Sequence, residues 1–106
     1  MKLLFKTLNP SNFKSEIIEL IEGDEAESWK ILESDGEKYL SHVKQWGEKG
    51  VIRLTTNISQ GRLIVEVLKF QGKEEDVKDF EAYYLGRFCE LVLVNFPNKF
   101  TTIEKQ

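Results

Sequence analysis

Two stretches of the chain repeat apolar residues at the three- and four-residue spacing of an α-helix that buries one face. The first, over about residues 11–22, carries Phe13 and most of its aliphatic side chains on one face and its glutamates on the opposite face. Ser11 or Asn12 can cap the start of this helix, and Gly23 favours its end. The spacing therefore predicts a short amphipathic helix near the N-terminus.

The second helical stretch is longer and covers about residues 74–96. Its apolar side chains form a continuous stripe from Val77 to Val92, which is wide enough to cover a sheet. The acidic residues at 74–76 suit a first helical turn, where the helix dipole favours negative charge, and Pro97 ends the helix. We therefore expect a long helix whose stripe packs on strands.

Between these stretches, apolar and polar residues alternate with the period of two that indicates β-strands. The runs at 29–32 and 38–43 flank Asp35-Gly36, a pair that favours a hairpin turn because both residues tolerate positive φ. A helix over 36–46 is the alternative for the second run. No capping residue precedes that segment cleanly, so a strand is the preferred interpretation.

The clearest hairpin joins strands at 51–58 and 62–70 through a turn at 59–61. Both faces of the strand at 62–70 carry apolar side chains, which predicts a central strand that is covered on more than one side. Short strands at 2–8 and 99–104 complete the pattern.

The resulting order, β-α-β-β-β-β-α-β, predicts an α+β fold of two layers. In this fold an antiparallel sheet, built from about residues 29–70 plus the terminal strands, is covered by the short N-terminal helix and the long helix at about 74–96. The chain has 106 residues and shows no repeat or linker, so we expect a single globular domain over residues 1–106. The pattern does not determine the order of the strands in the sheet.

The composition narrows the class of protein further. Hydrophobic residues make up 41% of the chain and charged residues 31%, a balance typical of soluble globular proteins and not of disordered ones. The longest apolar run near the C-terminus, 91–94, is far shorter than the roughly 20 residues that a membrane span needs. Cys89 is the only cysteine, so no intrachain disulfide can form. We expect a cytoplasmic protein with no membrane partner.

The sequence does not supply a complete set of catalytic groups. His42 is the only histidine, and Cys89 lies in the most apolar helix, where a buried and unreactive thiol is expected. No glycine-rich phosphate loop, calcium loop or cysteine–histidine metal cluster is present in the sequence. We therefore expect no catalytic residue, no metal and no cofactor, and we expect His42→Ala and Cys89→Ser variants to retain whatever activity is found.

The charges are unevenly distributed along the chain. Between Glu16 and Glu37 there are nine acidic residues and one basic residue, Lys30, whereas from Lys38 to Lys73 there are seven basic residues and two acidic ones. This asymmetry can steer a basic partner to an acidic surface. A solvated acidic face with no partner is the alternative. The basic segment lacks the aromatic signature of an RNA-binding sheet, so no nucleic-acid partner is expected.

These observations predict a small binding or regulatory module without chemistry of its own, which engages a basic protein partner through its acidic surface. Inhibitors and immunity proteins of bacterial toxins have this size and charge. The alternative is a small-molecule-binding or sensing domain with a pocket between the sheet and the long helix. The sequence determines neither the partner nor the oligomeric state. The residues expected to bind the partner are Glu19, Glu22, Asp24, Glu25, Glu27 and Trp46.

Overall fold

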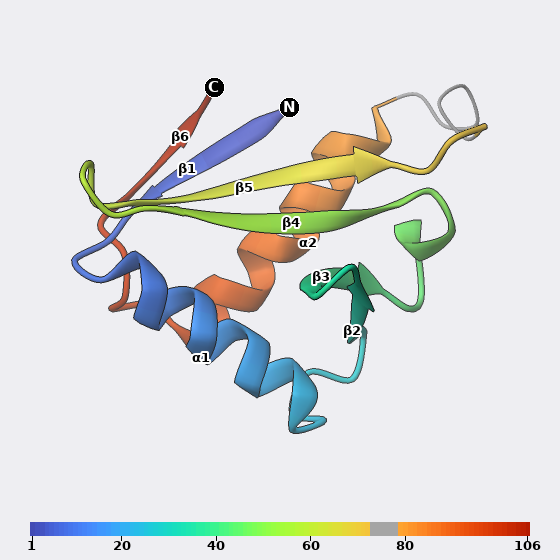
Figure 1. The fold of residues 1–106 in the computed structure, drawn as a ribbon, viewed down its shortest axis with the longest axis horizontal. Coiled ribbons are helices and arrows are strands. Elements are labelled where there is room, and N and C mark those ends of the chain that lie inside the picture. The colour runs from blue at the N-terminus through green and yellow to red at the C-terminus, as the bar shows by residue number, and fades with distance from the viewer. Residues whose placement is uncertain (73–78) are drawn as a thin grey trace.

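The computed structural model describes residues 1–72 and 79–106, and in these residues a six-stranded antiparallel sheet packs against two helices (Figure 1). The predicted α+β fold is thus confirmed. In chain order the elements are β1 (Lys2–Lys6), α1 (Pro10–Glu22), β2 (Trp29–Ser34), β3 (Glu37–His42), the short 3-10 helix η1 (Trp46–Glu48), β4 (Gly50–Asn57), β5 (Arg62–Lys69), α2 (Phe80–Asn95) and β6 (Thr102–Lys105).

The strands lie in the order β2-β3-β4-β5-β1-β6, and every neighbouring pair is antiparallel. β1 therefore lies between β5 and β6, so both terminal strands extend the sheet on the β5 side. The register places Phe5 opposite Leu63 of β5 and Ile103 of β6. The first and last strands are thus held side by side, and β1 separates β6 from the hairpin that the sequence predicted most clearly.

Helix α1 starts one residue earlier than predicted, and its cap is Asn9 instead of Ser11 or Asn12. The Asn9 side chain accepts a hydrogen bond from the backbone N–H of Asn12 at 3.0 Å. Pro10 follows at the first helical position, where its missing N–H costs nothing. At the other end Gly23 caps the helix as expected, and its N–H donates to the carbonyl of Glu19.

Both predicted hairpins are present. Asp35 and Gly36 have φ values of 52° and 79°, and Gly61 in the second turn has a φ of 65°. The segment that follows Gly36 is strand β3 and not a helix, which confirms the preferred interpretation. The strand at the C-terminus begins at Thr102 instead of residue 99, and β1 ends two residues earlier than predicted, at Lys6.

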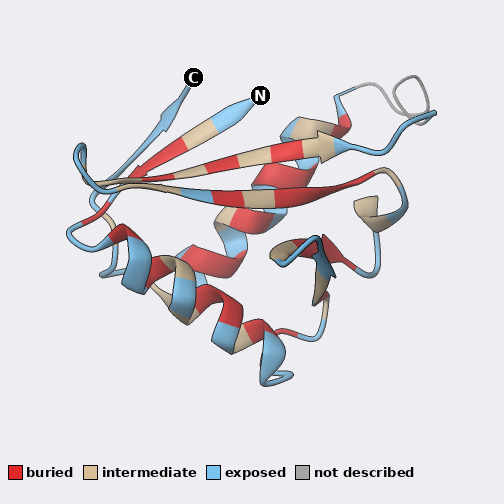
Figure 2. Cartoon of the chain, in the orientation of Figure 1, coloured by how far each residue is buried: buried red, intermediate tan, exposed pale blue. Residues whose placement is uncertain are grey.

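The core lies between the sheet and the two helices (Figure 2). The predicted stripe of the long helix is confirmed at Phe80, Tyr84 and Phe88, which are all buried. The Tyr84 hydroxyl donates to the carbonyl of Gly50 at 3.0 Å and accepts the N–H of His42 at 3.1 Å, so α2 is bonded to the ends of two strands. The predicted helical residues at 74–78 lie outside the described residues.

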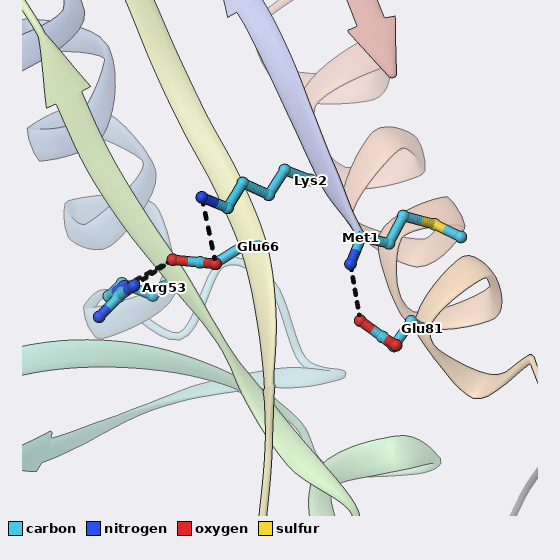
Figure 3. A network of polar contacts seen from close by, with 5 residues as sticks. All are labelled: Met1, Lys2, Arg53, Glu66 and Glu81. Carbon is cyan, nitrogen blue, oxygen red and sulfur yellow. Dashed lines mark hydrogen bonds and ion pairs between the residues drawn. The ribbon is translucent and has the colours of Figure 1, made fainter. Parts of the chain in front are cut away.

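Among the described residues, no helix packs on the other face of the sheet (Figure 1), and this corrects one prediction. Strand β5 is interior to the sheet, but Ile64 and Leu68 on its outer face are only partly buried, so the strand is covered on one side alone. On this outer face Glu66 forms ion pairs with Lys2 of β1 and Arg53 of β4 (Figure 3). On this face of β5 a charged residue alternates with the apolar ones, so the face can contact solvent. The number of apolar residues in β5 did not indicate this.

Candidate functional site

The acidic residues predicted to bind a partner lie at the C-terminal end of α1 and in the loop at residues 23–28 that leads to β2. Glu19, Glu22, Asp24, Glu25 and Glu27 are all exposed. The loop turns back on the helix end, because the N–H groups of Asp24 and Glu25 donate to carbonyls in the last turn of α1. Asp24 adopts a φ of 58°, a left-handed conformation that aspartate tolerates better than most residues.

A hollow of about 400 Å³ opens beside this loop, and we name it the acidic hollow. Three carboxylates line it: Glu22 from α1, Asp24 from the loop and Glu33 from β2. Lys30 is the one basic residue among its lining residues. The remaining lining residues are the apolar Ile21, Trp29 and Ile31. A hollow lined by both apolar side chains and carboxylates suits a long side chain that ends in a positive charge.

The charge of the acidic hollow is partly balanced from outside. The ammonium of Lys38 donates a hydrogen bond to Glu22 at 2.8 Å. This hydrogen bond and the negative charges of Glu22 and Glu33 raise the pKa of Lys38 above its usual value. Glu22 therefore already has a cationic partner within the protein.

The charges on α1 are arranged against the preference of a helix dipole. The first turn carries no acidic residue and the last turn carries no basic one. Glu19 and Glu22 instead lie near the C-terminal end, where the dipole is negative and favours cations. Glu19 and Glu22 are also three residues apart, so their like charges are neighbours on the helix surface. Glu19 and Glu22 are thus unfavourably placed on the isolated helix, and the ion pair with Lys38 offsets part of that cost at Glu22.

The predicted residues are not all brought together. Glu22 and Asp24 share the acidic hollow, whereas Glu19, Glu25 and Glu27 do not line it. Glu33 lines the hollow, but the sequence analysis did not predict it, because its position depends on the packing of β2 beside α1. The one sequence feature that could have indicated Glu33 is its place opposite Lys38 in the β2–β3 hairpin. Trp46 lies apart from the hollow on η1, where it is partly buried and its ring stacks on Tyr83 with centroids 5.6 Å apart.

A second, smaller hollow of about 290 Å³ lies beside His42, and we name it the histidine hollow. Trp29 lines this hollow as well as the acidic one. Its polar lining groups are largely bonded to protein. The Nδ1 atom of His42 accepts the N–H of Gln45 at 3.1 Å, and Arg87 donates to the Gln45 side chain and to Glu90, each at 2.9 Å.

His42 and Cys89 are placed differently with respect to the histidine hollow. Burial and the nearby Arg87 lower the pKa of His42 below its usual value. Burial raises the pKa of the Cys89 thiol, which disfavours the nucleophilic thiolate. Cys89 is also not among the residues that line the hollow. The arrangement therefore does not provide the activated thiol that a cysteine–histidine mechanism needs.

Within residues 1–72 and 79–106, no three His, Cys, Asp or Glu side chains are grouped so that they could hold a metal ion. In the same part of the chain no helix is both long and apolar enough to cross a membrane. Comparison with the models of known protein families, with curated proteins and with solved structures finds no match to this chain.

Proposed function

We propose that this protein is a binding or regulatory module that engages a basic protein partner through the acidic hollow and the exposed acids around it. The observation that carries the proposal is that Glu22, Asp24 and Glu33 line one hollow together with apolar side chains. A lysine or arginine of the partner would insert its aliphatic stem along Trp29 and place its charge among the carboxylates. An inhibitor- or immunity-like role fits this mode of binding.

The position of the acids on α1 supports the same proposal. Acids at the C-terminal end of a helix oppose its dipole, and a basic partner relieves that unfavourable interaction. The alternative of a pocket between the sheet and the long helix has less support. Tyr84 and Phe88 are fully buried in that interface, and the polar groups of the histidine hollow are largely bonded to one another.

The proposal is tested with a minimal probe in place of the unknown partner. N-acetyl-arginine amide and its uncharged isostere N-acetyl-citrulline amide are titrated into the protein, and backbone amide shifts are followed by NMR. The arginine compound is expected to shift the amides of Glu22, Asp24 and Glu33, and the citrulline compound is not. Shifts that spread evenly over other acids, such as Glu90 and Glu104, would overturn the proposal.

Reversal of charge at the acidic hollow is compared with reversal of charge at a distant acidic residue. Reversal of Glu22, Asp24 and Glu25 to lysine should abolish the arginine-dependent shifts, whereas Glu104→Lys, at the opposite edge of the sheet, should retain them. For a protein partner, the same triple reversal should slow association, as should a rise in salt, because steering depends on charges within about one Debye length, near 8 Å at physiological salt. An association rate that ignores both changes would contradict the proposal.

A further inference from the structure

A third hollow, the largest of the three described here, lies at the other end of the sheet, and we name it the end cleft. Its volume is about 820 Å³, which falls within the roughly 300–1,000 Å³ range of small-ligand pockets. Three segments that are distant in sequence form it: the connection from β1 to α1, the β4–β5 turn and the segment before β6. These segments gather at the left of Figure 1.

The end cleft has a firm apolar interior. Phe13 and Phe100 stack with their ring centroids 6.0 Å apart and nearly parallel planes. Phe100 also meets Phe5 edge-on at 5.2 Å. Hydrogen bonds fix the backbone around these rings, since the Thr7 hydroxyl donates to the carbonyl of Lys99 and the Thr101 N–H donates to that of Lys6. The cleft is therefore preformed.

The rim of the end cleft exposes apolar side chains that the core does not use. Leu8 is fully exposed, and Ile58 is 71% exposed. Both residues line the cleft. The strand was predicted to extend to residue 58, but β4 ends at Asn57, so Ile58 lies in the turn. Exposed aliphatic side chains that lie together beside a concave surface are a feature of sites that bind apolar ligands.

The charged residues that line the end cleft are all basic. Lys6 and Lys99 are its charged residues, and no aspartate or glutamate lines it, although the chain has 18 acidic residues. Lys99 is also paired with Glu16 at 3.2 Å, but no ion pair holds Lys6 within the described residues. Asn9 and Asn12 add amide groups at the N-terminal end of α1, which is the positive end of that helix. The charged residues that line the cleft are therefore both basic, which is compatible with an anionic ligand.

We propose that the end cleft binds a small amphipathic monocarboxylate, with an apolar body between Leu8, Ile58 and Phe100 and the carboxylate near Lys6. This inference is independent of the proposed function, because the acidic hollow lies at the opposite end of α1. The exposed apolar side chains, the aromatic lining and the lysines are together complementary to such a ligand, and neither a cation nor a fully polar anion would use all three.

The test uses octanoate as the probe, with octanamide as its neutral counterpart, and follows backbone amide shifts of the intact protein by NMR. Octanoate is expected to shift the amides of Leu8, Asn12 and Ile58 and to bind about tenfold more tightly than octanamide, because its carboxylate pairs with lysine. Equal binding of the two probes would overturn the assignment of an anion. Shifts outside the cleft, or no binding at about 10 mM octanoate, would overturn the site itself.

Substitutions at exposed positions can change binding without unfolding the protein. Lys6→Gln should weaken octanoate binding about three- to tenfold, while Lys14→Gln, on α1 but outside the cleft lining, should leave it unchanged. Leu8→Asn should weaken both probes without loss of stability, because the side chain it replaces is fully exposed. Equal effects of Lys6→Gln and Lys14→Gln would contradict the proposal. The arginine probe of the acidic hollow should bind all three variants normally.

Discussion

At the residue scale, His42 is the clearest case of a polar side chain whose state is determined by its surroundings. It is buried, its ring lies edge-on to Trp29 with centroids 5.0 Å apart, and its Nδ1 atom accepts a backbone N–H from Gln45. A protonated ring cannot accept that hydrogen bond. Burial and the positive charges of Arg87 and Lys44 also disfavour the proton, while Glu90 opposes them, and the net effect lowers the pKa.

This shift predicts that stability falls as the pH falls. Because the pKa of His42 is lower in the folded protein than in the unfolded chain, near 6.5, the unfolded state binds the proton more readily. The wild type should therefore lose up to about 1.4 kcal/mol of unfolding free energy between about pH 7.5 and about pH 5.5, and His42→Gln should not show this loss. Urea unfolding measures both. An NMR titration of the only histidine gives an independent check, and a pKa at or above 6.5 would contradict the prediction.

At the element scale, two glycines differ in the space that is available for a side chain, one in a β-strand and one in a helix. A Cβ on Gly50 would collide with the backbone carbonyl of Leu68 on the neighbouring strand β5. A Cβ on Gly86 would meet nothing within 4 Å, although Gly86 lies within α2. Close approach of two strands therefore requires the first glycine, whereas nothing in the described structure requires the second.

Substitution of each glycine by alanine should thus have opposite effects. Gly50→Ala should lower the free energy of unfolding by roughly 1–3 kcal/mol, because β4 and β5 must separate to admit the methyl group. Gly86→Ala should raise it by up to about 1 kcal/mol, because alanine is the better helix former at an exposed helical position. Chemical denaturation of the two variants beside the wild type measures both shifts. Changes of the same sign would show that this account of the two sites is wrong.

At the scale of the whole molecule, α1 connects two surfaces of opposite character. Its N-terminal end lies on the end cleft, which has no acidic lining residue, and its C-terminal end lies on the acidic hollow. The helix dipole favours anions at the first surface and disfavours the acids at the second. The small net charge of −3 therefore conceals an uneven distribution of charge along the chain, and the two ends of α1 lie on hollows with different linings.

This segregation predicts that the acidic end is under electrostatic strain in the free protein. Asp24→Asn combined with Glu25→Gln should raise the unfolding free energy at low salt by about 0.3–1 kcal/mol, because both acids follow the negative end of α1. Asparagine at position 24 also tolerates the left-handed backbone. Addition of salt from about 20 mM to about 300 mM should narrow the difference from the wild type.

Glu104→Gln is the matched control, since Glu104 faces Arg62 at 3.8 Å and its neutralisation should give no gain in stability. Urea midpoints at the two salt concentrations provide the measurement. A gain for Glu104→Gln equal to that of the double variant would mean that total charge, and not its position on α1, controls stability.

The sequence by itself determined the elements of this protein, because each depends on local periodicity and turn chemistry. The hairpin at Asp35-Gly36, the amphipathic face of α1 and the stripe at Phe80, Tyr84 and Phe88 depend on residues close together in the chain. The exposure of the acids after Gly23 follows from the same pattern. The cap at Asn9 was missed because Pro10 at the first helical position moves the start of the helix by one residue.

Only the tertiary structure decided which of these elements meet. The insertion of β1 between β5 and β6 depends on long-range strand pairing, which leaves no local signature. That pairing brings Lys6, Ile58 and Phe100 to one cleft, and the packing of β2 beside α1 brings Glu33 to Glu22. The segregation of charge was visible in the sequence. The grouping of Glu22, Asp24 and Glu33 around one hollow was not, because side chains distant in the chain become neighbours only in the folded protein.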